Sequence, residues 1–152
     1  MQRLIEGVQR LLGLTLTPEQ YRAFQLYHQE LVAWNERFNL TAITDPEGVQ
    51  VRHFLDSLSC LLAMRQAQKG QSLIDVGTGA GFPGLPIKIV RPGLRVTLVE
   101  ATGKKTDFLR HMVRLLDLRD VTVVHARAEE LGRDPSHREG YEWVVARAVA
   151  AM

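Results

Sequence analysis

The chain has 152 residues, with 19 basic and 17 acidic side chains and a formal net charge of +2. This length allows one medium-sized domain or a small domain with an extension. Cys60 is the only cysteine, which excludes an internal disulfide, and we expect it in a buried helix position. The single cysteine fits a reducing compartment, and we expect a cytoplasmic protein. The N-terminus has no uninterrupted apolar stretch, so we expect neither a signal peptide nor a membrane span.

The first third of the chain is predicted to be helical. Apolar residues recur at helical spacing over residues 4–12 and stop at Gly13. Residues 17–20, Thr-Pro-Glu-Gln, have the pattern of a capping box with proline at the first helical position. A third helix is predicted from Asp45 toward Met64. The second helix would carry an apolar stripe, more typical of a core than of a base-stacking surface: Phe24, Tyr27, Leu31, Trp34 and Phe38.

From residue 69 onward the pattern changes to strands alternating with helices. This alternation predicts an α/β fold with a parallel sheet and right-handed crossovers. We therefore divide the chain into an N-terminal helical segment, 1–68, and a Rossmann-like core, 69–152. The predicted strands are 72–76, 96–100, 121–125 and 143–146, and the predicted helices lie near 85–90 and 104–116.

A glycine-rich loop follows the first predicted strand. Gly77, Gly79 and Gly81 fall at every second position, and such a loop between strand and helix lets a ligand approach the backbone. Phe82 stands where a dinucleotide-binding pattern has glycine or alanine, which disfavours NAD. Glu100 ends the next strand, 19 residues after Gly81, where an acid is expected to bind ribose hydroxyls.

The loop, with Asp75 two residues before its first glycine, resembles the S-adenosylmethionine loop of Class I methyltransferases. From about Trp34 onward the chain resembles the glucose-inhibited division protein B family, also called ribosomal RNA small subunit methyltransferase G. The resemblance implies S-adenosylmethionine-dependent methylation of guanine N7 in 16S ribosomal RNA. It rests mainly on the segments 34–43 (WNERFNLTAI), 52–58 (RHFLDSL), 75–86 (DVGTGAGFPGLP) and 146–150 (ARAVA).

The resemblance also implies roles for individual residues. The glycine loop would hold the methionine end of the cofactor, Glu100 the ribose, and residues 128–129 the adenine edge. Arg147 would lie near the methyl donor and the substrate, as the catalytic residue. Asp75 would orient the loop, reach the cofactor's amino group or have a purely structural role. The full cofactor set is Asp75, Gly77, Gly79, Gly81, Phe82, Glu100, Ala101, Thr102, Ala128, Glu129 and Arg147.

The expected chemistry needs no general base. Guanine N7 carries a lone pair and attacks without losing a proton, so catalysis would consist of alignment and electrostatic help. The segment 82–119 holds eight basic and three acidic residues, which suits a polyanion or, alternatively, a solvated helix surface. Candidate RNA contacts, each with a surface or structural alternative, are Arg52, His53, Lys104 and Lys105. No metal site is predicted.

Two other functions remain open from the sequence: a small-molecule methyltransferase and an NAD-dependent oxidoreductase. Because a doubly wound methyltransferase sheet has about seven strands, we interpret the chain as C-terminally truncated after about four. We expect the longer parent to be a monomer acting on 16S ribosomal RNA, naked or within the small subunit. We expect this shorter chain to lack full activity, and either to be less stable than the longer parent or to self-associate.

Overall fold

The computed structural model describes residues 1–133 and 140–146. In them, a four-stranded sheet has the order β3-β2-β1-β4, and every neighbouring pair is parallel. The α/β fold predicted from the strand–helix alternation is confirmed. The strands are β1 (Ser72–Val76), β2 (Arg95–Glu100), β3 (Val121–His125) and β4 (Trp143–Val145).

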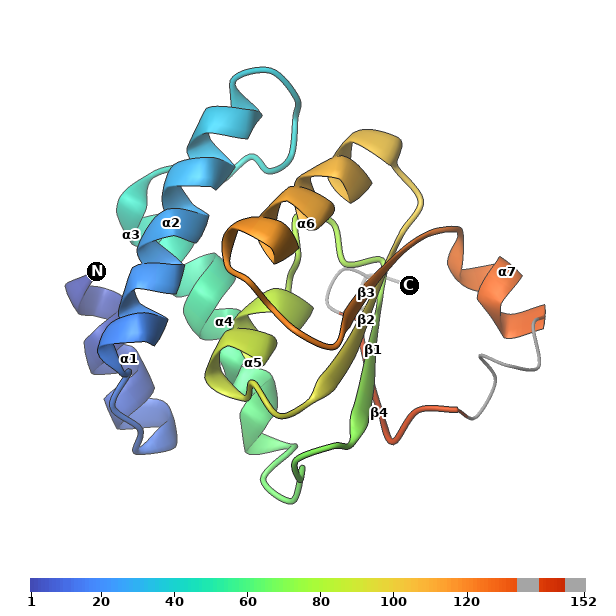
Figure 1. Cartoon of the computed structure of the whole chain (residues 1–152). Coiled ribbons are helices and arrows are strands. Elements are labelled where there is room, and N and C mark those ends of the chain that lie inside the picture. The colour runs from blue at the N-terminus through green and yellow to red at the C-terminus, as the bar shows by residue number, and fades with distance from the viewer. Residues whose placement is uncertain (134–139, 147–152) are drawn as a thin grey trace.

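The helices between the strands divide between the two faces of the sheet. Figure 1 shows α5 (Gly84–Val90) and α6 (Gly103–Leu115) on one face and α7 (Ala128–Arg133) beyond the other. The chain steps from β1 to β2 to β3 in one direction and then returns to place β4 on the far side of β1. Right-handed crossovers require the helix face to change at that reversal. Ligands of such sheets bind at the carboxyl ends of the strands beside the reversal.

The first helix ends and the second begins where the sequence pattern predicts, but the second helix ends at Asn35, before Phe38, which the predicted apolar stripe included. In α1 (Gln2–Leu12), Gly13 ends the helix in the left-handed conformation. In α2 (Pro18–Asn35), the Thr17 hydroxyl accepts the Gln20 N–H at 3.1 Å, and the Gln20 side chain accepts the Thr17 N–H at 2.9 Å. The predicted capping box is therefore confirmed, with both of its hydrogen bonds in place.

The predicted third helix is present in extent but not in geometry. It consists of α3 (Pro46–Gly48), a π-helix η1 (Val49–Leu55), α4 (Asp56–Leu58) and a 3₁₀ turn η2 (Ser59–Leu62). The wide π turn brings residues five apart onto one side, and Val49 and Phe54 are both fully buried. Cys60, expected to be buried, is only half-buried because it lies in the terminal 3₁₀ turn.

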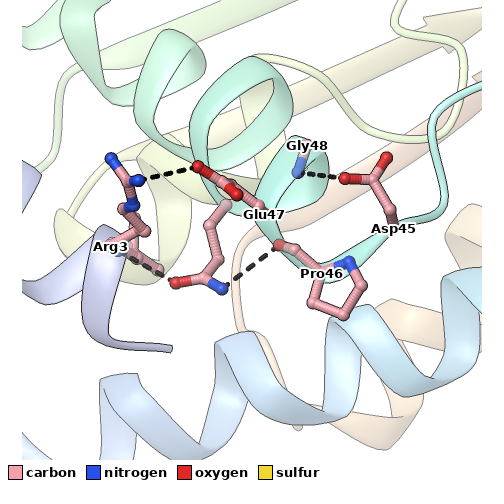
Figure 2. A network of polar contacts seen from close by, with 7 residues as sticks. Arg3, Asp45, Pro46, Glu47 and Gly48 are labelled. Atoms are coloured by element: carbon pink, nitrogen blue, oxygen red, sulfur yellow. Dashed lines mark hydrogen bonds and ion pairs between the residues drawn. The ribbon is translucent and has the colours of Figure 1, made fainter.

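A polar network joins the start of α1 to this helical run (Figure 2). The Gln50 side chain accepts the Leu4 N–H at 3.1 Å and donates to the Pro46 carbonyl at 3.2 Å. Arg3 and Glu47 form an exposed ion pair at 2.9 Å. The Asp45 carboxylate caps α3 by accepting the Gly48 N–H at 2.8 Å.

One buried apolar cluster includes residues of the helical segment and of the sheet. Leu73 and Leu98 belong to the sheet face that packs into it, and Phe24 and Phe54 come from the helices. On the opposite face, Val144 is 68% exposed.

The boundary at residue 68 between the helical segment and the Rossmann-like core stays a prediction. Among the described residues, no helix has the length and apolar character to cross a membrane.

Candidate functional site

The glycine loop leaves β1 at the carboxyl edge of the sheet, and its glycines serve two purposes. Gly77 and Gly79 have φ values of +71° and +61°, and a Cβ added to either would meet no atom within 4 Å. The loop therefore borders open space there, where a ligand can approach the backbone. Gly81, at φ +107°, is packed instead: a Cβ would collide with the Tyr27 hydroxyl and lie 2.6 Å from Leu85 Cδ1.

Asp75 is fully buried beneath this loop. Its Oδ2 accepts the Thr78 hydroxyl at 2.6 Å and the Gly84 N–H at 2.8 Å. These two bonds tie the middle of the loop and the start of α5 to the end of β1. The geometry favours the loop-orienting role over contact with a cofactor amino group.

Glu100 ends β2 with only 7% of its surface exposed. Its Oε1 accepts the Gly79 N–H at 2.8 Å and its Oε2 accepts the Thr102 N–H at 2.9 Å. The carboxylate thus links the glycine loop to the loop after β2. Each oxygen has lone pairs beyond these bonds, so the group can also accept hydroxyls of a ligand lying across the strand ends.

The remaining predicted cofactor residues follow β2 and β3 at the same edge. Ala101 and Thr102 are exposed between β2 and α6, and the Ala101 carbonyl lies 2.9 Å from His125 Nε2 at the end of β3. The exposed Ala128 and Glu129 begin α7, a helix that the sequence interpretation missed. Arg147, the predicted catalytic residue, lies outside the described residues, so its role stays a prediction.

Phe82 contributes its side chain as well as its backbone to the loop. Its ring lies nearly parallel to that of His53, with centroids 4.2 Å apart and planes 4° apart. It is also stacked on Tyr27, at 5.5 Å and 10°. The Tyr27 hydroxyl donates to the Ala80 carbonyl at 2.6 Å. Tyr27 and His53 of the helical segment therefore hold the glycine loop in place.

The candidate RNA contacts lie in different environments. Arg52 is exposed, whereas its neighbour His53 is 4% exposed and belongs to the packing beneath the glycine loop. Lys104 is exposed, with its Nζ 4.6 Å from the centroid of the Phe38 ring, and Lys105 is half-buried. Lys88, which the sequence placed in a basic segment, is buried and donates to carbonyls within the loop after α5.

A pocket of about 170 Å³ lies between the glycine loop and the loop after α2. Sequence reasoning assigned no role to Leu40 and Thr41, which form part of its wall, although both fall within the segment 34–43 that resembles the family. That motif was the only available signal, because no spacing rule connects these residues to the loop after β1.

Comparisons with known proteins show the family of this chain. The family model described as rRNA small subunit methyltransferase G, GidB, matches residues 20–152. The chain is 62% identical over 143 residues to the ribosomal RNA small subunit methyltransferase G of Roseiflexus sp. (strain RS-1), covering 94% of this chain and 60% of that protein. The protein of that name from Chloroflexus aggregans (strain MD-66 / DSM 9485) is 52% identical over 151 residues, which cover 99% of this chain and 63% of that protein. The chain spans about three fifths of the length of the curated relatives it matches.

Among solved structures, the chain resembles a coclaurine N-methyltransferase bound to N-methylheliamine and SAH. The TM-score is 0.52 at 18% identity, covering 95% of this chain and 48% of that one. This likeness bears on the fold alone. Sheet order and structural likeness together define a Rossmann-like fold of the Class I methyltransferase kind. The chain belongs to the rRNA small subunit methyltransferase G, or GidB, family.

Proposed function

We propose that the chain forms the cofactor-binding part of an S-adenosylmethionine-dependent methyltransferase that acts on 16S ribosomal RNA. The observation that carries this proposal is the position of Glu100. It binds the N–H groups of the glycine loop and of the loop after β2 at one sheet edge, in a chain of this family.

The residues at this edge fit the proposed cofactor. Space is open beside Gly77 and Gly79, so the backbone can face a ligand directly. The Glu100 carboxylate has acceptor capacity for the two hydroxyls of a ribose. Ala101, Thr102 and the first residues of α7 are exposed beyond it, where the adenine would extend.

The reaction we propose is methyl transfer to guanine N7. The sulfonium of the bound cofactor supplies an electrophilic methyl group. Guanine N7 carries a lone pair and no proton, so it can attack the methyl group without a general base. The chain's own task is to bind the cofactor and the RNA and to hold N7 in line with the methyl group. In this proposal Arg147 lies near the reacting atoms, and the RNA backbone contacts the exposed Arg52 and Lys104 and the half-buried Lys105.

The proposal is tested by methylation of small-subunit RNA with the protein at its natural length. Mass spectrometry of the digested RNA should show 7-methylguanine, and the Arg147→Ala variant should lose turnover while it keeps cofactor affinity. Methylation confined to an exocyclic amine or a ribose would contradict the N7 chemistry. Cofactor binding with a methylated small molecule and unmodified RNA would favour the alternative of a small-molecule enzyme.

A further inference from the structure

The pocket between the two loops lies next to β1, one strand away from Glu100. Along the sheet, α7 with the proposed adenine contacts follows β3, Glu100 ends β2, and the glycine loop follows β1. A nucleoside ligand that extends along these strand ends therefore reaches the pocket with the group attached to its ribose. The pocket is lined by Leu40, Thr41, His53, Gly77, Thr78, Gly79, Ala80 and Phe82.

Thr41 and His53 provide the polar side of this pocket. The Thr78 hydroxyl already donates to Asp75, and the other lining side chains are apolar or absent. Thr41 Oγ1 lies 2.7 Å from His53 Nε2 and accepts the Ile43 N–H at 3.1 Å. In the His53 tautomer that carries its hydrogen on Nε2, two donors point at this oxygen. The threonine O–H is then available to donate to an acceptor in the pocket.

The position of this hydroxyl is fixed from both sides. Asn35 Oδ1 accepts the N–H groups of Leu40 and Thr41 at 2.8 and 3.0 Å, which holds the backbone of the loop after α2. His53 is buried in the π-helix, with its ring on Phe82 of the glycine loop. A donor held in this way binds a ligand with little further loss of entropy.

We propose that the Thr41 hydroxyl binds the carboxylate of the cofactor's amino-acid end, and that His53 is a positioning residue that acts through Thr41. The assignment rests on the proposed function, because it needs S-adenosylmethionine or its product as the ligand. It makes the helical segment part of the cofactor site. It also gives a role to the π-helix, a geometry that is frequent at functional sites.

Two ligands separate this role from a structural one. S-adenosylhomocysteine carries the amino-acid end, and 5′-methylthioadenosine lacks it but keeps the adenine and ribose. By calorimetry, Thr41→Val should raise the Kd for S-adenosylhomocysteine about tenfold, as expected for one lost hydrogen bond to a charged group. Its Kd for 5′-methylthioadenosine should not change. Thr41→Ser should restore affinity, and Thr44→Val, the same change outside the pocket lining, should have no effect.

The role of His53 is tested in the same assay. His53→Phe keeps an aromatic ring against Phe82 but removes Nε2, so it should weaken S-adenosylhomocysteine less than Thr41→Val does. Added to Thr41→Val, it should cause no further loss, because its effect passes through the hydroxyl. Thermal unfolding of each variant confirms that it is folded.

Three outcomes would overturn the assignment. If Thr41→Val weakens both ligands by the same factor, the residue only shapes the pocket. If it leaves S-adenosylhomocysteine binding unchanged, the hydroxyl does not contact the ligand. If the unaltered chain binds neither compound, the proposed function fails and the assignment fails with it, a result that is distinguishable from the first two.

Discussion

Replacing Gly81 with alanine should destabilise the chain more than replacing Gly77 does. At Gly81 the backbone has φ +107°, and a new Cβ would collide with the Tyr27 hydroxyl and lie 2.6 Å from Leu85. Backbone strain of this kind costs about 1–3 kcal/mol. Displacing the hydroxyl from its 2.6 Å bond to the Ala80 carbonyl adds about 1 kcal/mol. We expect Gly81→Ala to lower the free energy of unfolding by about 3 kcal/mol.

Gly77→Ala is the matched control, because its φ is also positive, at +71°, but a Cβ there meets nothing within 4 Å. Only the left-handed conformation is penalised, at about 1–2 kcal/mol. Urea denaturation followed by circular dichroism measures both changes. Tyr27→Phe in the Gly81→Ala background should recover part of the loss, since it removes the oxygen that collides. Equal costs for the two glycines, or no recovery, would refute the packing argument.

Three further predictions concern stability. Hydrogen bonds from Ser72 hold the pKa of the Glu142 carboxyl below 4.5. The resulting stabilisation is present above pH 4.5 and is lost as the pH falls through the lowered pKa, so the Tm advantage over Glu142→Gln should shrink as the pH falls below 4.5. Burial lowers the pKa of Lys88 below 10.5. Between the lowered pKa and pH 10.5 the unfolded chain binds more protons than the folded chain, so the free energy of unfolding should rise with pH in that range. The Lys88→Met variant should lack this rise. That variant should cost about 2 kcal/mol at neutral pH, because two carbonyls lose their donor. By urea denaturation, Gln50→Ala should cost about 1–2 kcal/mol and Arg3→Ala, in an exposed pair, less than about 0.5 kcal/mol.

The parts of the fold that the sequence predicted are those governed by local rules. The capping box at Thr17, the end of α1 at Gly13 and the strand before the glycine loop each follow from neighbouring residues. The acid at Glu100 was found because its distance from the loop is set by one crossover helix. In the structure, its bond to Gly79 brings the two predicted residues together at one edge of the sheet.

The parts that were missed depend on contacts between distant residues. The π turn of η1 has no local signature, because it reflects what Val49 and Phe54 pack against. Lys88 counted as a surface cation until the carbonyls of Pro92 and Leu94 supplied buried partners. Thr41 and His53 meet the glycine loop only through the packing of the helical segment on the sheet. No periodicity along the chain predicts that contact.

We propose that the sheet edge marked by the glycine loop and Glu100 binds S-adenosylmethionine. The most direct measurement is calorimetry of the chain with S-adenosylhomocysteine and, separately, with NAD. We predict binding of S-adenosylhomocysteine without measurable binding of NAD. Glu100→Ala should lose about 1.5–3 kcal/mol of binding free energy, because it removes charge-assisted bonds to the ribose. Preference for NAD, or unchanged affinity in Glu100→Ala, would contradict this proposal.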